Sequence, residues 1–344
     1  MTGIYSDPRC LEHVSAGHPE RPERMAAALT ALRRNEDEYD WPEIRPAAPE
    51  LIGRVHEERL VRGIAEFAAT GGGWVDPDTF VVPASYEAAL LAAGGTLQAV
   101  DDVLAGRQDN AFVVVRPPGH HAMRGRSMGF CLFNSVAVAA RWALDEGKAR
   151  RVAILDIDVH HGNGTQEIFW DAPEVLYYST HQFPFYPGTG RLQEIGTDDG
   201  QGTTVNVPLM GGCGDETYLE VTERVLVPSL RRFAPDLVMV SLGFDAHWAD
   251  PLANMQLSNA GYASILGRIR DLAAELCGGR LVLLLEGGYD LRVIGEGAAL
   301  AGTVLTGRAR LADALGPAPS AREPAEAAAV IAQACAIHGL PTAS

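Results

Sequence analysis

Short apolar runs rich in β-branched residues recur along this sequence and alternate with longer segments rich in Ala and Leu. The apolar runs cover residues 111–115, 152–155, 175–178, 204–207, 237–241 and 281–285. The segments predicted as helices include residues 86–104, 136–146, 216–233 and 260–276. Strands and helices that alternate in this way form a mostly parallel sheet, because parallel neighbours need a crossover connection. The pattern therefore predicts an α/β fold of three layers, with helices on both faces of the sheet.

The chain is long enough for one sizeable domain. It has 344 residues, 47% of them hydrophobic, and no internal repeat is visible. Lengths of this order occur in single α/β domains. A Pro- and Ala-rich stretch at 316–323 leads to a last predicted helix at 324–338. We predict one domain over residues 1–310, with residues 311–344 as a helical extension packed on it.

Composition limits the partners and the compartment. The formal charge of −16 argues against nucleic-acid binding, which needs clustered Lys and Arg. The acidic excess would suit a cationic substrate, although many proteins are acidic for solubility alone. No membrane span and no signal peptide are visible, so we expect a soluble, cytoplasmic chain with no membrane contact. The five cysteines are widely spread and never form a Cys-x-x-Cys pair, so we expect them to be reduced and buried.

Unusual polar side chains follow the predicted strands at the points where the strands end. These clusters lie at residues 116–121, 156–161, 179–181, 243–245 and 286–289. In open parallel sheets, ligands bind at the carboxyl ends of the strands. Five clusters that are separate in the sequence are therefore predicted to meet at one site.

Two of these clusters supply candidate metal ligands. Alternate side chains of an extended segment project to the same side, so Asp158 and His160 can bind one ion together. Asp245, from another strand end, adds a third ligand and leaves room for water and substrate, as in catalytic zinc sites. A ligand set without sulfur also admits Fe(II), Co(II) or Mn(II). Taken singly, each residue is more simply explained as a helix cap or a buried core side chain; the whole set is not.

His120, His121 and Tyr289 are the candidate catalytic groups. The two histidines end a Pro-Pro-Gly turn whose prolines stiffen the backbone. Such a pair suits hydrolysis, with one neutral ring to activate water and one charged ring to stabilise the developing anion. Tyr289 follows two glycines, which allow a bend that presents the phenol as an oxyanion donor. A His-His pair alone is only weak evidence of a catalytic site. The Gly-Gly-Tyr sequence is explained equally well by a tyrosine that lies over the sheet edge.

Together these motifs resemble the histone deacetylase and acetylpolyamine amidohydrolase superfamily, which has the arginase-like fold. The similarity covers residues 3–305, and its motifs are His18-Pro19-Glu20-Arg21-Pro22-Glu23-Arg24, residues 116–121, Gly129-Phe130-Cys131 with Asn134, residues 156–166, Tyr186-Pro187-Gly188-Thr189-Gly190, residues 243–245 and residues 286–289. The resemblance implies a central sheet of eight strands and makes residues 1–310 a deacetylase catalytic domain. Asn163, Glu286 and the segment 245–252 are more similar to class II deacetylases and bacterial amidohydrolases than to class I enzymes.

The resemblance also implies roles for residues. It places one zinc ion per chain on Asp158, His160 and Asp245, with His121 as the water-activating base, His120 as its charged partner, Tyr289 as oxyanion donor, Asp156 behind His120 and Asn163 behind His121. A carboxylate favours the imidazolium more than an amide does, which is why we predict His121 to be the neutral ring.

Two further sites follow from the resemblance alone. A potassium ion behind the zinc is expected on Asp156, Ser179 and the backbone oxygens of Asp158, His160 and Thr180. The substrate tunnel is expected between Phe130 and Tyr186, with Leu252 on the wall, Gly129 near the floor and Glu286 facing it. Tyr186 stands where Phe is common, which makes that wall more polar.

The leading hypothesis is hydrolysis of N-acetyl amides on lysine side chains of proteins or peptides, or on acetylated polyamines. One alternative is a strict small-molecule acetylpolyamine amidohydrolase, which the acidic charge would favour. Another is an inactive acyl-lysine binding module, which is disfavoured because every matched catalytic position is filled. A homo-oligomer is compatible with the sequence.

Overall fold

Eight parallel strands form the centre of the protein. The computed structural model describes residues 1–308, 312–320 and 323–341. The strand order is β2-β1-β5-β10-β9-β6-β7-β8, and every neighbouring pair is parallel. The strands are β1 (Thr2–Tyr5), β2 (Tyr39–Asp40), β5 (Asn110–Val113), β6 (Val152–Asp156), β7 (Val175–Gln182), β8 (Thr204–Leu209), β9 (Leu237–Leu242) and β10 (Leu281–Leu285). The predicted α/β class and strand number are confirmed.

Each predicted run falls on one of the strands β5 to β10. The sequence patterns do not predict the first two strands. β1 has four residues, one of them glycine, and β2 has two residues, so neither offers a β-branched run or an alternation long enough to recognise. They extend the sheet beyond β5.

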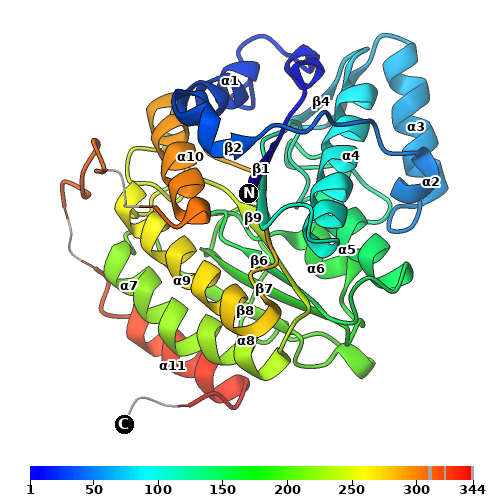
Figure 1. Cartoon of the computed structure of the whole chain (residues 1–344). Coiled ribbons are helices and arrows are strands. Elements are labelled where there is room, and N and C mark those ends of the chain that lie inside the picture. The colour runs from blue at the N-terminus through cyan, green and yellow to red at the C-terminus, as the bar shows by residue number, and fades with distance from the viewer. Residues whose placement is uncertain (309–311, 321–322, 342–344) are drawn as a thin grey trace.

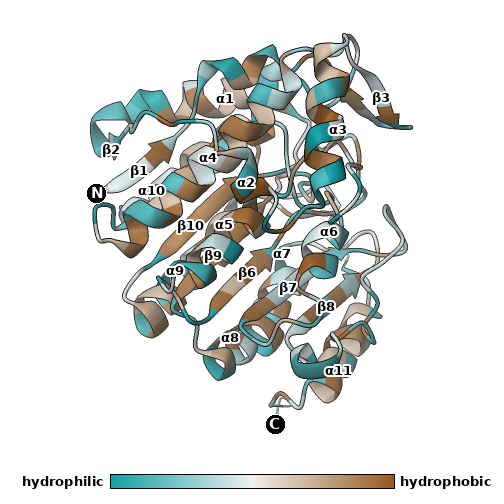
Figure 2. Cartoon of the chain, turned by 90° about the vertical axis from the view of Figure 1, so that its right-hand side faces the viewer, coloured by the Kyte–Doolittle hydropathy of each residue, from teal (hydrophilic) through white to brown (hydrophobic). Residues whose placement is uncertain are grey.

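Helices cover both faces of the sheet (Figure 1). On one face lie α7 (Asp215–Val221), α8 (Val227–Phe233), α9 (Asn259–Cys277), α10 (Leu291–Thr306) and α11 (Ala327–Ile337), and α1 (Pro22–Leu32) packs on α10. On the other face lie α4 (Ser85–Leu104) and α5 (Ser135–Asp145). Figure 2 shows the sheet strands as a largely hydrophobic layer between helices of mixed hydropathy, as expected for a sheet buried on both faces.

The helix predicted over 216–233 is interrupted. A π-helical turn at Thr222–Leu226 separates α7 from α8. Pro228 stands in the first turn of α8, where its missing N–H breaks the regular hydrogen-bond ladder. Further along, α11 packs against β8 and α7. The predicted boundary between residues 310 and 311 lies outside the described residues.

Smaller elements lie around the sheet and its covering helices. They are α2 (Pro49–Ile52), α3 (Glu58–Ala69), α6 (Asn163–Ile168), the antiparallel hairpin of β3 (Gly73–Asp76) and β4 (Thr79–Val81), and short 3-10 turns at Pro8–Glu12, Arg33–Glu38 and Asp198–Gly200. Within the described ranges, no helix is both long and apolar enough to cross a membrane.

The register of the sheet brings the polar clusters together. Asp156, the last residue of β6, is opposite Ser179 on β7 and Ser241 on β9. Leu285, the last residue of β10, is opposite Leu242 at the end of β9. The segments that follow these strands therefore leave the sheet at the same edge, as the sequence predicted.

Candidate metal centre and substrate tunnel

Asp158, His160 and Asp245 meet beyond the ends of β6 and β9. One ligand atom of each lies within 4.8 Å of the others. His160 Nδ1 is 3.1 Å from Asp158 Oδ1 and 3.2 Å from Asp245 Oδ2. Both carboxylates are completely buried. The structure thus brings together the three residues predicted to hold the metal.

Two glycines make space for these carboxylates. A Cβ atom on Gly243 would lie 2.0 Å from Asp158 Oδ2, and one on Gly287 would lie 2.0 Å from Asp245 Oδ2. Any side chain at either position would displace the acids. The strand ends following β9 and β10 are therefore shaped around the carboxylates.

The hydrogen bonds of the two acids leave a place for a cation. Asp158 Oδ2 accepts from Gly287 N at 2.8 Å, and Asp245 Oδ1 accepts from Val159 N at 3.0 Å. The buried Asp245 Oδ2 faces His160 Nδ1 at 3.2 Å but has no hydrogen-bond donor of suitable geometry among the described residues. Burial raises the pKa of Asp245, and the nearby charge of Asp158 raises it further. Two buried acids that repel each other, with one oxygen unsatisfied, fit a divalent cation bound by oxygen and nitrogen.

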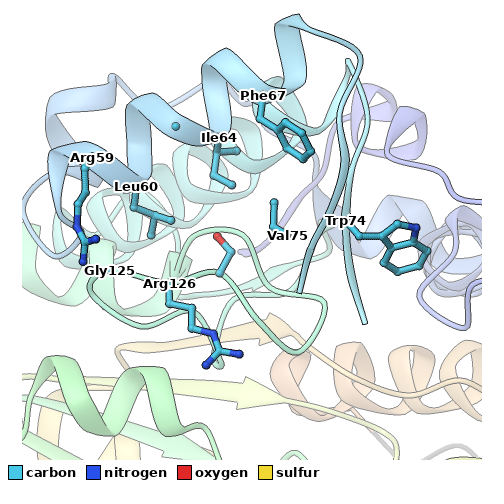
Figure 3. Close-up of a pocket in the computed structure, with 10 residues that line it drawn as sticks. Arg59, Leu60, Ile64, Phe67, Trp74, Val75, Gly125 and Arg126 are labelled. Carbon is cyan, nitrogen blue, oxygen red and sulfur yellow. The ribbon is translucent and has the colours of Figure 1, made fainter. Parts of the chain in front are cut away.

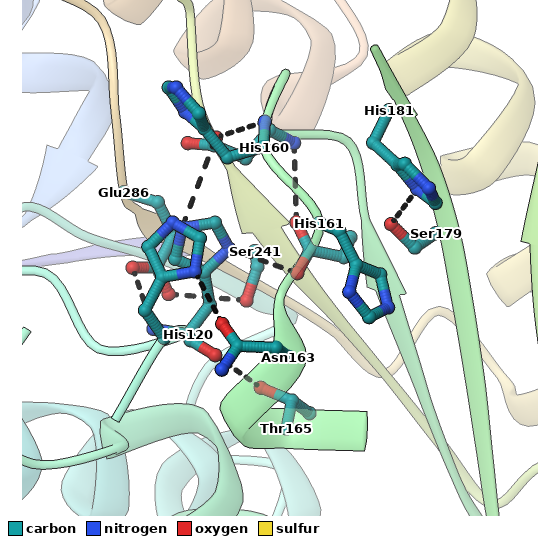
Figure 4. A network of polar contacts seen from close by, with 12 residues as sticks. His120, His160, His161, Asn163, Thr165, Ser179, His181, Ser241 and Glu286 are labelled. Atoms are coloured by element: carbon teal, nitrogen blue, oxygen red, sulfur yellow. Dashed lines mark hydrogen bonds and ion pairs between the residues drawn. The ribbon is translucent and has the colours of Figure 1, made fainter. Parts of the chain in front are cut away.

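The two adjacent histidines have different partners within the polar network of which Figure 4 labels His120 and Asn163. His120 Nδ1 is 3.1 Å from Asp156 Oδ2, whereas His121 Nδ1 is 2.8 Å from Asn163 Oδ1. Burial lowers the pKa of His120, but the charges of Asp156 and Asp158 outweigh burial and raise it to about 10. Burial lowers the pKa of His121 well below its usual value, and the charges of His120 and His160 lower it further. These directions are those predicted from a carboxylate and an amide partner.

Tyr289 comes from the segment after β10 and is fixed on two sides. Its backbone N–H donates to Asp250 Oδ2 at 2.7 Å. The guanidinium of Arg24 lies 4.8 Å from the centre of its ring and also donates to the carbonyl oxygens of Gly288 and Glu286. Arg24 is the last residue of the motif at residues 18–24, but the sequence alone assigns it no role. Neither it nor Asp250 was predicted as a site residue, because contacts to backbone atoms leave no spacing pattern.

A tunnel of about 250 Å³ leads to these groups. Its lining includes His120, His121, His160, Tyr289, Gly129, Phe130, Tyr186 and Leu252. The lining thus contains every predicted tunnel residue except Glu286. Gly129 has φ of +59°, and a Cβ there would lie 2.4 Å from His121 Cδ2, so this position requires glycine. Phe185, stacked on His160 at 5.3 Å, and Asp78, on the hairpin turn, also line the tunnel and were not predicted.

The placement of Glu286 on the tunnel is wrong. Its side chain is 1% exposed and is not part of the lining. Oε2 accepts hydrogen bonds from Gly119 N at 2.7 Å and from His120 N at 3.3 Å, and Oε1 accepts from Ser241 Oγ at 3.2 Å. These donors hold the carboxylate behind the histidine pair. Glu286 therefore supports the backbone of this pair from the protein side.

The residues predicted for potassium lie next to the metal cluster. Asp156 and Ser179 are opposite each other on β6 and β7, and both are completely buried. Ser179 Oγ is 2.9 Å from His181 Nδ1, and Thr180 Oγ1 is 2.6 Å from Tyr178 OH. Backbone oxygens of Asp158, His160 and Thr180 complete the predicted set, which stays a prediction.

Comparison with known proteins gives one consistent result. The family model described as histone deacetylase domain matches residues 18–305. Histone deacetylase 14, chloroplastic, from Arabidopsis thaliana is 40% identical over 328 residues, covering 90% of this chain and 78% of that protein. The histone deacetylase-like amidohydrolase from Pseudomonas aeruginosa is 42% identical over 312 residues, covering 84% and 82%.

A solved structure agrees over nearly the whole length. The crystal structure of the HDA15 HD domain matches with a TM-score of 0.90 and 37% identity, covering 98% of this chain and 94% of that chain. Both sequence and fold thus point to one family, and the site described above lies within the matched residues. The chain belongs to the histone deacetylase family of hydrolases.

Proposed function

We propose that this protein is a zinc-dependent deacylase that hydrolyses N-acetyl amides of lysine side chains or of acetylated polyamines. The observation that carries the proposal is the cluster of Asp158, His160 and Asp245, whose ligand atoms lie within 4.8 Å of one another at a tunnel lined by two histidines and a tyrosine. A narrow tunnel suits a long alkyl-amide side chain, and the relatives named deacetylase and amidohydrolase agree with amide hydrolysis.

Asp158, His160 and Asp245 would hold the zinc ion, with Fe(II) or Co(II) as substitutes. When bound, zinc supplies a Lewis acid that polarises the amide carbonyl and makes water easier to deprotonate. A potassium ion at Asp156 and Ser179 would add positive charge behind this centre.

The protein groups divide the proton transfers between them. His121, neutral and oriented by Asn163, takes a proton from the attacking water as the new C–O bond forms. His120, charged against Asp156, and the phenol of Tyr289 stabilise the negative oxygen of the tetrahedral intermediate. When the C–N bond breaks, the histidine pair returns a proton to the leaving amine. The products are acetate and a free amine.

A substrate panel tests this function. We expect the zinc-loaded protein to hydrolyse acetyl-lysine peptides, free acetyl-lysine or acetylputrescine, with kcat/KM reduced by about a hundredfold or more in His121→Ala and Tyr289→Phe. Turnover of polyamines but of no peptide would identify a strict acetylpolyamine amidohydrolase, which the net charge of −16 favours. Full activity in both variants would refute the assigned roles.

A further inference from the structure

A groove of about 380 Å³ lies between α3 and the β3–β4 hairpin (Figure 3). Leu60, Ile64 and Phe67 of α3 line one side, and Val75 of β3 lines the other. Val75 is 38% exposed and its neighbour Trp74 is 58% exposed, although both are large and apolar. Apolar surface gathered in a concave site and left open to water is typical of a binding site.

Two chain segments connect this groove with the tunnel. Val75 lines the groove, and Asp78, three residues later, lines the tunnel. In the same way Arg126 lines the groove, and Gly129 and Phe130 line the tunnel. Three residues of chain span at most about 10 Å, and the first of these segments is shorter because it crosses the hairpin turn. A substrate whose acyl-lysine fills the tunnel would therefore pass the groove about two to four residues away.

Aromatic contacts fix the hairpin against the tunnel wall. The ring of Trp74 lies 6.0 Å from that of His18, and His18 lies 4.7 Å from Phe130. Phe130 in turn lies 5.9 Å from Tyr289. His18 also bonds the backbone of the hairpin, with Nε2 3.0 Å from the carbonyl oxygen of Asp78. The groove is thus held in a defined position relative to the catalytic groups.

The charges around the groove distinguish between the two substrate classes. Its edges carry the guanidinium groups of Arg59 and Arg126, and each is paired with an acid, Arg59 with Glu57 and Arg126 with Asp76. Among the described residues that line the groove none is acidic, so the groove itself offers no carboxylate to the ammonium groups of a polyamine. The apolar side chains between them fit an apolar side chain instead.

We propose that this groove binds an apolar side chain of a peptide substrate, about two to four residues from the acylated lysine. The groove then gives the protein a preference for peptides over polyamines. This inference rests on the proposed deacylase function and adds the substrate class to it.

The test scans a peptide library with the full-length, zinc-loaded protein. Acetyl-lysine stands in a neutral Ser/Gly peptide, and a single leucine replaces serine at each position from −4 to +4. We expect leucine at one or two positions, at least two residues from the lysine, to raise kcat/KM by about tenfold, since much of its surface leaves water. A flat profile, or a gain only next to the lysine, would overturn the proposal.

Val75→Asp places a charge in the groove and is expected to abolish the leucine preference while leaving free acetyl-lysine and acetylputrescine turnover within about twofold. Val14→Asp is the matched control, because Val14 is 50% exposed and lines a different hollow beside Tyr289. It is expected to keep the preference. If Val75→Asp keeps the preference, or loses turnover of every substrate alike, the groove does not act as proposed.

Peptide binding, measured by fluorescence anisotropy, separates failure of the two proposals. Binding that favours leucine and depends on Val75, with no turnover of any acyl-amine, would support the groove and refute the deacylase function. Turnover without any leucine preference would support the deacylase function and refute the proposed role of the groove. A wild-type dimer that Val75→Asp converts to a monomer, with peptide preference unchanged, would assign the groove to a second copy of the chain and overturn the proposal.

Discussion

The backbone nitrogen of Tyr289 donates a hydrogen bond of 2.7 Å to Oδ2 of Asp250. The other oxygen of this carboxylate accepts from the backbone nitrogen of Leu252 at 2.9 Å. Asp250 is 6% exposed, so water offers little substitute for these contacts. One side chain thus ties the proposed oxyanion donor to a residue of the tunnel wall.

Asp250→Asn should therefore slow catalysis through Tyr289. Asp250 Oδ2 also accepts from Asp290 N at 3.4 Å, and because an amide group has only one acceptor oxygen, the N–H groups on one side of the carboxylate would lose their partner. We expect kcat for an acetyl-lysine peptide to fall by about tenfold to a hundredfold. In a Tyr289→Phe background the same change should lower kcat little further. An equal fall in both backgrounds would mean that Asp250 does not act through the tyrosine.

The partner of His121 sets the pH at which activity appears. In the proposed mechanism this ring must be neutral, so activity is lost as pH falls through the pKa of His121, which burial keeps well below the usual value. In Asn163→Asp a carboxylate replaces the amide 2.8 Å from Nδ1 and favours the imidazolium. The acidic limb of kcat/KM against pH should move upward by about one unit or more. Tyr289→Phe should lower kcat without moving this limb; an unmoved limb in Asn163→Asp would reject His121 as the base.

The meeting of the three proposed metal ligands with the histidine pair could be predicted from sequence because these residues directly follow recognisable strands. Asp158 and Asp245 come from separate strand ends, and parallel pairing brings such ends together. Asp78 and Phe185 could not be found in this way, since the hairpin and loop that carry them lie outside the sheet. Glu286 was misplaced because a strand-end position does not determine whether a side chain faces the tunnel or the protein interior.

A buried ion pair near the N-terminus predicts how stability depends on pH. Burial raises the pKa of Glu20, but the charges of Arg116 and Arg24 outweigh it and lower the pKa to about 2 from 4.5. A carboxyl group whose pKa is lower in the folded state stabilises the fold fully above its unfolded-state pKa. This stabilisation is lost as pH falls to the folded-state pKa. The wild type should therefore lose about 3 kcal/mol of unfolding free energy between about pH 4.5 and 2 through this group.

Chemical denaturation over this pH range measures the effect. Glu20→Gln should be less stable at neutral pH, because two buried arginines lose a charged partner, and should show a flatter acid dependence. Glu36→Gln, at a pair with Arg33 that is more than half exposed, is the control and should follow the wild type. Parallel curves for Glu20→Gln and the wild type would contradict the pKa assigned to Glu20.

The hydroxyl group of Tyr186 is expected to destabilise the fold relative to phenylalanine at the same position. Its hydroxyl oxygen is buried and has no hydrogen-bond partner among the described residues. Tyr186→Phe should increase the unfolding free energy by about 1 kcal/mol, measured in urea. Tyr262→Phe is the matched control of opposite sign, since its hydroxyl accepts from Ala246 N at 3.0 Å and its removal should destabilise. Loss of stability in Tyr186→Phe would show that its hydroxyl is satisfied in solution.

Removal and return of the metal decide whether Asp158, His160 and Asp245 hold a catalytic ion. The three ligands form one site, so the protein stripped with a chelator should lose at least about a hundredfold in kcat/KM on acetyl-lysine or acetylputrescine. One equivalent of zinc per chain should restore it, and Asp245→Ala should neither bind this equivalent nor recover. Undiminished turnover by the metal-free protein, or full zinc binding and activity in Asp245→Ala, would show that these residues do not form a catalytic metal site.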